Sequence, residues 1–93
     1  MAWSVKLHKN VEKQALKLPR LAIAALYELM ASIRVSGPIR CDWPNYGKLE
    51  GTTNRHHCHL KKGHPTYVAV WTENKQTITV EIIYAGTHEK APY

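Results

Sequence analysis

Histidines recur in the second half of the chain at spacings that suit proton-transfer chemistry. His57 and His59 are two residues apart, and His88 stands near the end of the sequence, which closes with Tyr93. Imidazole has an unperturbed pKa of about 6.5, so it exchanges protons near neutral pH. In a strand, residues two apart point to the same face, so His57, His59 and Lys61 would share one face. The pattern predicts a titratable surface beside positive charge, which is the raw material of an acid–base site.

The other histidines are expected to have simpler roles. His56, Cys58 and Leu60 would point to the opposite, partly apolar face of the same strand. We expect His56 to be a residue at the edge of the sheet, His64 to lie in a turn, and His8 to be exposed at the end of a strand.

Composition predicts one folded, basic domain spanning residues 1–93. The chain has 93 residues and is 44% hydrophobic, enough for a compact core but hardly for a second domain. Thirteen Lys and Arg against seven Asp and Glu give a formal charge of +6. Such a charge favours a polyanionic partner, either nucleic acid, the ribosome or an acidic protein, although an unspecialised basic surface is the plain alternative.

The N-terminal segment and the lengths of the apolar stretches predict a cytoplasmic protein with no membrane contact. The sequence starts with Met-Ala-Trp-Ser-Val-Lys, which lacks the apolar core of a secretory signal. The longest uncharged apolar stretch, 21–27, is too short to cross a bilayer. We therefore expect Cys41 and Cys58 to remain free thiols.

Helix and strand signals follow in a definite order in the first half of the chain. Apolar residues alternate over 3–7, as in a half-buried strand. Asn10 is the expected N-cap of a short helix that Pro19 ends. A second helix is predicted over 21–35, with apolar residues at helical spacing, and Ser36-Gly37-Pro38 stops it.

The second half of the chain reads as a sheet. We expect strands at 48–49, 55–61, 66–72 and 77–84, with turns at 51–54, 62–65 and 73–76. Trp71 is expected in the core, and the last strand should present Ile78, Val80, Ile82 and Tyr84 to it. The predicted fold class is α+β, with two N-terminal helices packed as a hairpin on a small, mostly antiparallel sheet.

This order of elements resembles the RelE/ParE superfamily of type II toxins. The resemblance rests on Lys48-Leu49-Glu50-Gly51, the segment 67–71, and the terminal Gly-Thr-His-Glu-Lys-Ala-Pro-Tyr, and it covers nearly the whole chain. Cys58-His59-Leu60 followed by Gly86-Thr87-His88 looks closest to the histidine-using YafQ-like ribonucleases. The resemblance implies a curved RelE-like sheet, cleavage of mRNA in the A site of the 70S ribosome, and a cognate antitoxin, which we expect to be acidic.

The resemblance also suggests roles for individual residues. His59 falls on the family's strand histidine, His88 on a basic residue of its C-terminal motif, and Tyr93 on its terminal aromatic. His57 lies where relatives carry lysine or an acidic residue. Several relatives have an arginine where this chain has Val68, so other cations would have to hold phosphate charge. The expected substitutes are Lys61, Arg55 and Lys90.

Metal-independent RNA cleavage needs three kinds of group. A base removes the proton of the 2′-hydroxyl, an acid protonates the leaving 5′-oxygen, and cations stabilise the charge on phosphate. We expect His59 or His57 as base and His88 as acid, although the two roles could be exchanged, with Tyr93 stacking on or orienting the substrate. The expected RNA-binding residues are Arg55, Lys61, Lys90, Trp43 and Lys48.

Other interpretations of the same residues remain open. His57, His59 and His88 could bind a metal ion as three histidine ligands, but the histidine run has no acidic neighbour to orient them, and we expect no cofactor. The chain could also be a ParE-like toxin that binds DNA gyrase, or an inactive module that only binds an antitoxin. The plainest alternative is that the histidines form a solvated strand face and that His88 and Tyr93 lie in a flexible tail.

Overall fold

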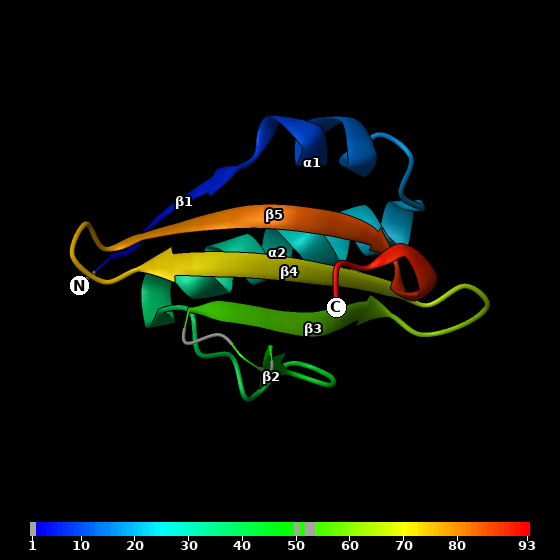
Figure 1. Cartoon of the computed structure of the whole chain (residues 1–93). Helices are drawn as coiled ribbons and strands as arrows, with labels where there is room; N and C mark the ends of the chain where they lie inside the picture. Colours follow the sequence, from blue (N-terminus) through cyan, green and yellow to red (C-terminus); the bar gives the residue numbers. More distant parts are fainter. Residues whose placement is uncertain (1, 50, 52–53) are drawn as a thin grey trace.

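The described residues form two α-helices, five strands and a short 3₁₀ turn (Figure 1). The computed structural model describes residues 2–49, 51 and 54–93, so part of the predicted turn at 51–54 lies outside the described residues. The elements are β1 (Ser4–Leu7), α1 (Lys9–Ala15), α2 (Arg20–Ser36), β2 (Gly47–Lys48), β3 (Arg55–Lys61), β4 (Tyr67–Asn74), β5 (Thr79–Thr87) and the short 3₁₀ turn η1 (His88–Lys90). The predicted α+β class and the order of elements are confirmed.

The five strands form one mixed sheet. Their order across the sheet is β1-β5-β4-β3-β2. Strands β2 to β5 pair antiparallel, as predicted, but β1 pairs parallel to β5, so the sheet is not antiparallel throughout. The first strand of the chain thus pairs with the last. Both helices lie between β1 and β5 in the sequence. The alternation of apolar residues within one strand does not indicate which distant strand it pairs with.

Helix α2 begins and ends where the sequence predicts. Pro19 precedes it, and the Gly37 N–H bonds the Ile33 carbonyl at its C-terminus. Gly37 has a φ of 92°, a conformation that glycine tolerates and other residues rarely adopt. The predicted N-cap of α1 is wrong: His8 is the cap, and its Nδ1 accepts a hydrogen bond from the Asn10 N–H at 3.1 Å.

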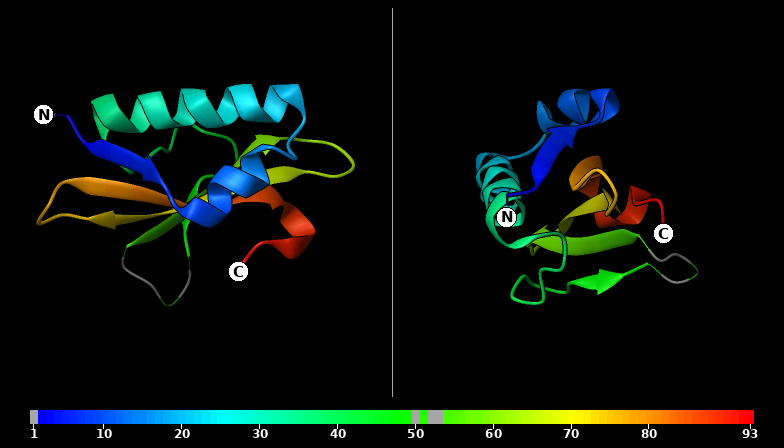
Figure 2. Two further views of the ribbon diagram at one scale, coloured as in Figure 1. Left: turned by 90° about the horizontal axis from the view of Figure 1, so that it is seen from above. Right: turned by 90° about the vertical axis from the view of Figure 1, so that its left-hand side faces the viewer.

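The helices do not form the expected hairpin. Helix α2 lies along one face of the sheet, whereas α1 lies beyond the edge of β5 (Figures 1 and 2). Helix α1 contacts β5 and β1, and α2 contacts β3 and β1. On the part of β5 that β1 leaves unpaired, the Gln14 Oε1 accepts a hydrogen bond from the Ala85 N–H at 3.0 Å. Helix α1 therefore caps the sheet edge instead of packing beside α2.

The core lies between α2 and the sheet. Trp71 on β4 is fully buried, as predicted, and its Nε1–H donates to the Pro38 carbonyl at 3.0 Å. The core side chains from α2 are Ala22, Leu26, Leu29, Met30 and Ile33, and those from the central strands are Cys58, Ala69, Trp71, Val80, Ile82 and Ala85. No helix among the described residues has the length and hydrophobicity needed to span a membrane.

Strand β3 presents two different faces. The bounds of β3 match the prediction. Cys58 is buried on the side of α2, and His57 and His59, which flank it in the sequence, point to the opposite face. Both cysteines are free, and burial raises the pKa of the Cys58 thiol to about 12. The expectation for His56 is wrong: it is fully buried on the helix side of an inner strand rather than at an edge.

Two β-bulges move side chains from the faces predicted for them. Between His59 and Lys61 the register shifts, and Lys61 pairs with Tyr67, which packs against the core cluster on the helix side. Lys61 therefore does not share a face with His59, because one extra residue reverses the alternation.

The second bulge changes the last strand in the same way. Trp71 pairs with Ile82 but Val70 pairs with Tyr84, so one extra residue lies in β5. Tyr84 consequently leaves the core face, and Ala85 takes the core position instead. Ile78 is also misplaced by the prediction, since it lies in the turn before β5 with a φ of 54°.

Candidate active site

The C-terminal segment turns back over the face of the sheet that α2 leaves open. After β5, η1 reverses the chain, and the last residues run back in front of β4 (Figure 1). The His88 N–H donates to the Thr66 carbonyl at 2.8 Å, and the Tyr84 hydroxyl donates to the Thr87 carbonyl at 2.7 Å. These two bonds tie the turn to the β3–β4 loop and to β5, so the tail has a defined place.

Four aromatic rings from two distant segments meet on this face. The ring centroids of His57 and Tyr93 are 4.7 Å apart, in a stacked arrangement with an interplanar angle of 29°. His59 and His88 lie edge to face at 5.7 Å. Tyr93 also lies edge to face with His88, at 5.9 Å. The structure therefore brings together all four residues that the sequence suggested for catalysis, although their roles remain predictions.

Two imidazoles of this cluster, those of His57 and His59, lack a hydrogen bond at Nδ1 within the described part of the chain. The Nδ1 atoms of both His57 and His59 are buried without a partner among the described residues. By contrast, both ring nitrogens of the buried His56 are bonded. A buried polar atom without a partner is rare in folded proteins and costs stability, so its retention calls for a functional explanation. Among the described residues, no hydrogen bond at Nδ1 fixes the ring of His57 or of His59.

Burial, more than neighbouring charge, favours the neutral form of His57 and His59. It lowers the pKa of His57, with smaller contributions from His59, His88 and His56. Burial likewise lowers the pKa of His59, and the charges of His88 and Lys62 make smaller contributions in the same direction. Lys62 is the cationic side chain that contributes to the lower pKa of His59. The lowered pKa values favour the neutral form of both imidazoles.

Titration of the imidazoles provides a direct check. In the folded chain, the Cε1–H proton resonances of His57 and His59 should titrate below pH 6.5, because a depressed pKa means that the proton binds only in more acidic solution. In denaturant, where burial is lost, the same resonances should titrate near the ordinary value of about 6.5. Titration at or above that value in the folded chain would contradict the burial that the structure gives these rings.

Tyr93 closes the cluster with a largely undissociated phenol. Burial raises the pKa of Tyr93, and the proximity of Cys58 and Tyr84 raises it further. The ring is about half exposed, so one part stacks on His57 while the rest remains open to solvent. An exposed aromatic surface beside acid–base groups is suited to stack on a nucleobase.

A cavity opens beside the His59–His88 pair. Its volume is about 340 Å³, comparable with small-molecule sites. The lining residues are His59, Gly63, His64, Pro65, Thr66, His88 and Glu89. His64 lies in the β3–β4 loop as predicted, but nothing in the sequence indicated that this loop would border the site.

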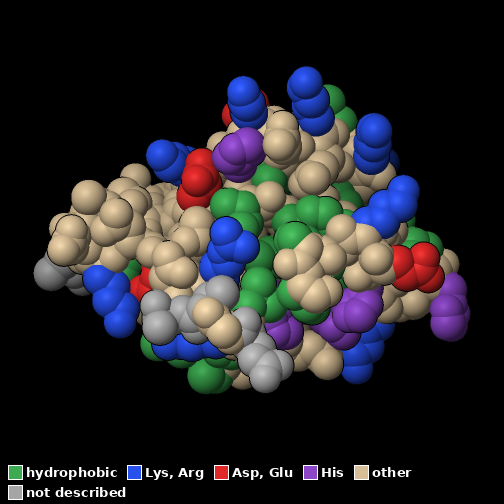
Figure 3. Space-filling model, viewed as in Figure 1, with side chains coloured by type: hydrophobic (Ala, Val, Ile, Leu, Met, Phe, Trp, Pro, Cys, Tyr) green, Lys and Arg blue, Asp and Glu red, His purple; other side chains and the backbone are tan. Residues whose placement is uncertain are grey.

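The charged residues suggested for RNA binding are spread over several parts of the surface. Figure 3 views this face and shows histidine side chains in its lower part, with Lys and Arg side chains along the edges and near the centre. Arg55 is exposed at the start of β3, on the His57 face by alternation. Lys90 lines a second cavity of about 440 Å³ together with Lys17 and Gln14.

Two of the suggested RNA contacts lie away from the cluster. Lys48 pairs with His56, which places it on the opposite face from His57. Trp43 packs against the core and borders a cavity next to Ser32 and Leu60 on the side of α2. The structure therefore does not bring Lys48 or Trp43 to the cluster of His57, His59 and His88.

The histidine cluster does not have the arrangement of a metal centre. In the part of the chain that the structure describes, no group of three or more His, Cys, Asp or Glu side chains is arranged to hold a metal ion. The alternative in which His57, His59 and His88 coordinate a metal has no support from this geometry.

Comparison with known proteins rests on structure. The sequence matches no protein-family model and no curated protein. The structure is similar to a mutant of the Escherichia coli toxin RelE in the free state, with a TM-score of 0.77 and 20% identity over 98% of this chain and 88% of that one. It is similar to the archaeal RelE–RelB complex from Pyrococcus horikoshii, with a TM-score of 0.74 and 22% identity over 98% of this chain and 100% of that one. The structure is also similar to a YoeB dimer from Staphylococcus aureus, with a TM-score of 0.69 and 15% identity over 95% of this chain and 99% of that one. The chain therefore has the fold of the RelE and YoeB toxins.

Proposed function

We propose that residues 1–93 form one toxin domain that cleaves messenger RNA, on the ribosome and without a metal ion, and so inhibits translation. The observation that carries this proposal is the convergence of the imidazoles of His57, His59 and His88 with Tyr93 beside an open cavity. The likeness to RelE and YoeB toxins supports the toxin class. The closer likeness to YafQ rests on the sequence motifs alone.

The proposed reaction uses the substrate's own 2′-hydroxyl as nucleophile. His57 or His59 removes its proton, and the oxygen attacks the adjacent phosphate. His88 protonates the 5′-oxygen as the P–O bond breaks, which leaves a cyclic phosphate on one fragment and a 5′-hydroxyl on the other. A base must be neutral before it acts, and burial of His57 and His59 favours that state. His59 and His88 lie on the same cavity, so a phosphate there could contact both.

Positive charge must hold the substrate and stabilise the pentacovalent phosphate. Lys62 is the cation whose charge acts on His59. Arg55 lies at the start of β3, and Lys90 borders the second cavity. Lys61 lies on the other face and would have to reach around the end of the strand. The formal charge of +6 favours binding to RNA and to the ribosome, which would supply much of the positioning.

The proposed partner is a small acidic antitoxin, and the proposed location is the cytoplasm. A RelE neighbour is recorded in complex with RelB, which supports such a partner. The two edge strands of the sheet are β1 and β2, and β2 has only two residues. An antitoxin could add a strand at one of these edges or cover the histidine cluster directly.

Mapping RNA ends in cells tests the proposal. Induction of the chain should produce new 5′-hydroxyl ends within translated mRNA, while plasmid supercoiling stays unchanged, because the chemistry acts on a 2′-hydroxyl that DNA lacks. Gyrase–DNA cleavage complexes without new RNA ends would instead support a ParE-like toxin. If induction produced neither new RNA ends nor gyrase–DNA cleavage complexes, and the chain still bound its antitoxin, the result would indicate an inactive binding module.

A further inference from the structure

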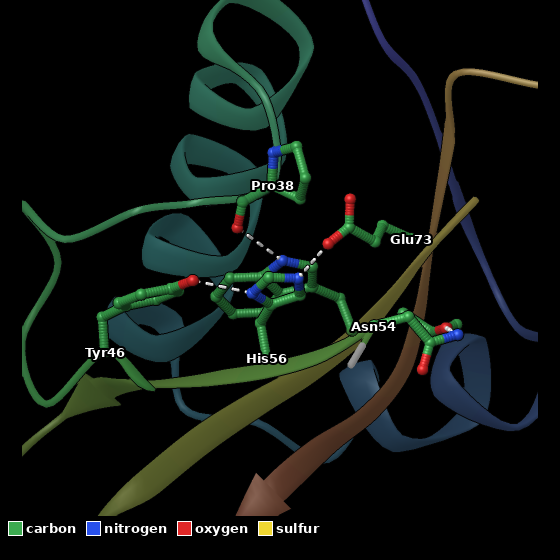
Figure 4. A network of polar contacts seen from close by, with 7 residues as sticks. Pro38, Tyr46, Asn54, His56 and Glu73 are labelled. Atoms are coloured by element: carbon green, nitrogen blue, oxygen red, sulfur yellow. Dashed lines mark hydrogen bonds and ion pairs between the residues drawn. The ribbon is translucent and has the colours of Figure 1, made fainter. Parts of the chain in front are cut away.

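A buried polar network lies behind the histidine cluster, on the helix side of the sheet (Figure 4). The Tyr46 hydroxyl is 2.7 Å from His56 Nδ1, and His56 Nε2 is 2.8 Å from Glu73 Oε1. His56 is fully buried and Glu73 is 6% exposed. The proposed cleavage reaction uses none of these three groups. Buried ionisable residues are costly, so the network calls for a separate explanation.

The chemistry of the groups fixes the direction of the hydrogen bonds. An ionised carboxylate only accepts, so His56 Nε2–H donates to Glu73. In neutral imidazole the other nitrogen then carries a lone pair, and the Tyr46 hydroxyl donates to Nδ1. Burial lowers the pKa of His56, while Glu73 raises it to a lesser extent, which favours this neutral form. Every ring nitrogen in the network has a partner.

Ring stacking gives the network a rigid shape. The rings of Tyr46, His56 and Trp71 form a triangle, because the centroids of Tyr46 and Trp71 are 5.8 Å and 5.7 Å from that of His56 and 6.1 Å from each other. The His56 and Trp71 rings are nearly parallel, at 9°. The Trp71 Nε1–H bond to the Pro38 carbonyl fixes the start of the segment between α2 and β2. The Tyr46 bond fixes its end. The connecting segment is thereby anchored at two points on β3 and β4.

The same segment contacts the strand that carries the site histidines. The Pro44 carbonyl accepts the backbone N–H of His59 at 2.8 Å. Gly47 pairs with His57, and a Cβ atom at Gly47 would lie 3.1 Å from His57 Nε2. Tyr46 stands between these two contact points in the sequence. The position of Tyr46 therefore sets both the backbone of His59 and the space beside the His57 ring.

We propose that Tyr46, His56 and Glu73 are positioning residues that orient His57 and His59 by holding segment 44–47 against β3. Tyr93 stacks on the His57 ring while Gly47 lies against its Nε2, so a shift of the segment would free the ring to rotate. The kinetic consequence of this inference rests on the proposed ribonuclease function. The structural consequence, a change at His57 and His59, does not depend on it.

Replacing Tyr46 by phenylalanine tests the proposal. Tyr46→Phe keeps the stacked ring but removes the donor to His56, so the segment loses its anchor. We expect kcat for cleavage of ribosome-bound mRNA to fall by about tenfold to a hundredfold, with KM nearly unchanged, because small misplacements of catalytic groups have effects of this size. We also expect the imidazole NMR resonances of His57 and His59 to shift in the free protein.

Two comparisons separate positioning from general loss of stability. Ile33→Val removes one methyl group from the fully buried part of α2, so it should lower stability but leave kcat and both histidine resonances unchanged. Glu73→Ala should lower kcat as Tyr46→Phe does. Glu73→Gln, whose amide oxygen can still accept from His56 Nε2–H, should restore most of the activity.

The possible outcomes distinguish the two proposals. If the wild-type chain cleaves mRNA and Tyr46→Phe has wild-type kcat and unshifted His57 and His59 resonances, the positioning role is wrong and the ribonuclease function stands. If the wild type cleaves no mRNA but both resonances shift in Tyr46→Phe, positioning is supported and the ribonuclease function is wrong.

Discussion

His88→Ala and His59→Ala should each lower the rate of mRNA cleavage by about 10²–10⁴-fold, the usual contribution of one acid–base group. The two rings meet edge to face beside the cavity, and neither side chain has a hydrogen-bond partner among the described residues. Removing either one should therefore leave the fold and antitoxin binding intact. Single-turnover cleavage on ribosomes and growth after induction measure the loss.

A third histidine provides the matched control. His8 caps α1, away from the cluster, and asparagine is a good N-cap that can make the same bond to the backbone. His8→Asn should keep full toxicity and cleavage. The acid–base assignment would be ruled out if His59→Ala and His88→Ala were as toxic as His8→Asn.

Leu26→Ala should lower the free energy of unfolding by about 2–5 kcal/mol, as usual for a fully buried leucine. Leu26 is 0% exposed and lies on the face of α2 that packs against the sheet. Its loss leaves a cavity that the mixed sheet cannot fill without moving strands. For a domain of this size, such a change is a large part of the total stability.

The same substitution on the other face of the helix is the control. Leu21 is 67% exposed, so Leu21→Ala should change the free energy of unfolding by no more than about 0.5 kcal/mol. Urea denaturation followed by circular dichroism compares the two variants. Similar losses for both would mean that the buried face of α2 is assigned incorrectly.

Local patterns predicted the elements and one face of the site correctly. The apolar spacing over 21–35 corresponds to α2, and the alternation over 55–61 separates His57 and His59 from the buried Cys58. Such periods are set by the geometry of a single helix or strand, so the sequence carries them directly. The meeting of His88 and Tyr93 with β3 was expected from a resemblance, and no local pattern implied it.

Local patterns failed where one residue changes the register. The bulge after His59 moves Lys61 to the helix side, and the bulge in β5 moves Tyr84 out of the core. His56 looked like an edge residue because nothing in its neighbourhood identifies Tyr46 and Glu73 as its partners. Each error concerns a contact between segments that are distant in the sequence.

The sequence by itself determined a basic α+β chain with titratable groups alternating along one strand, because charge and side-chain period are properties of consecutive residues. Only the tertiary structure decided that β1 pairs with β5, that the C-terminal turn places His88 and Tyr93 over His57 and His59, and that His56 is buried behind them. These features depend on strand pairing and on burial against other elements, and both are set when the whole chain packs.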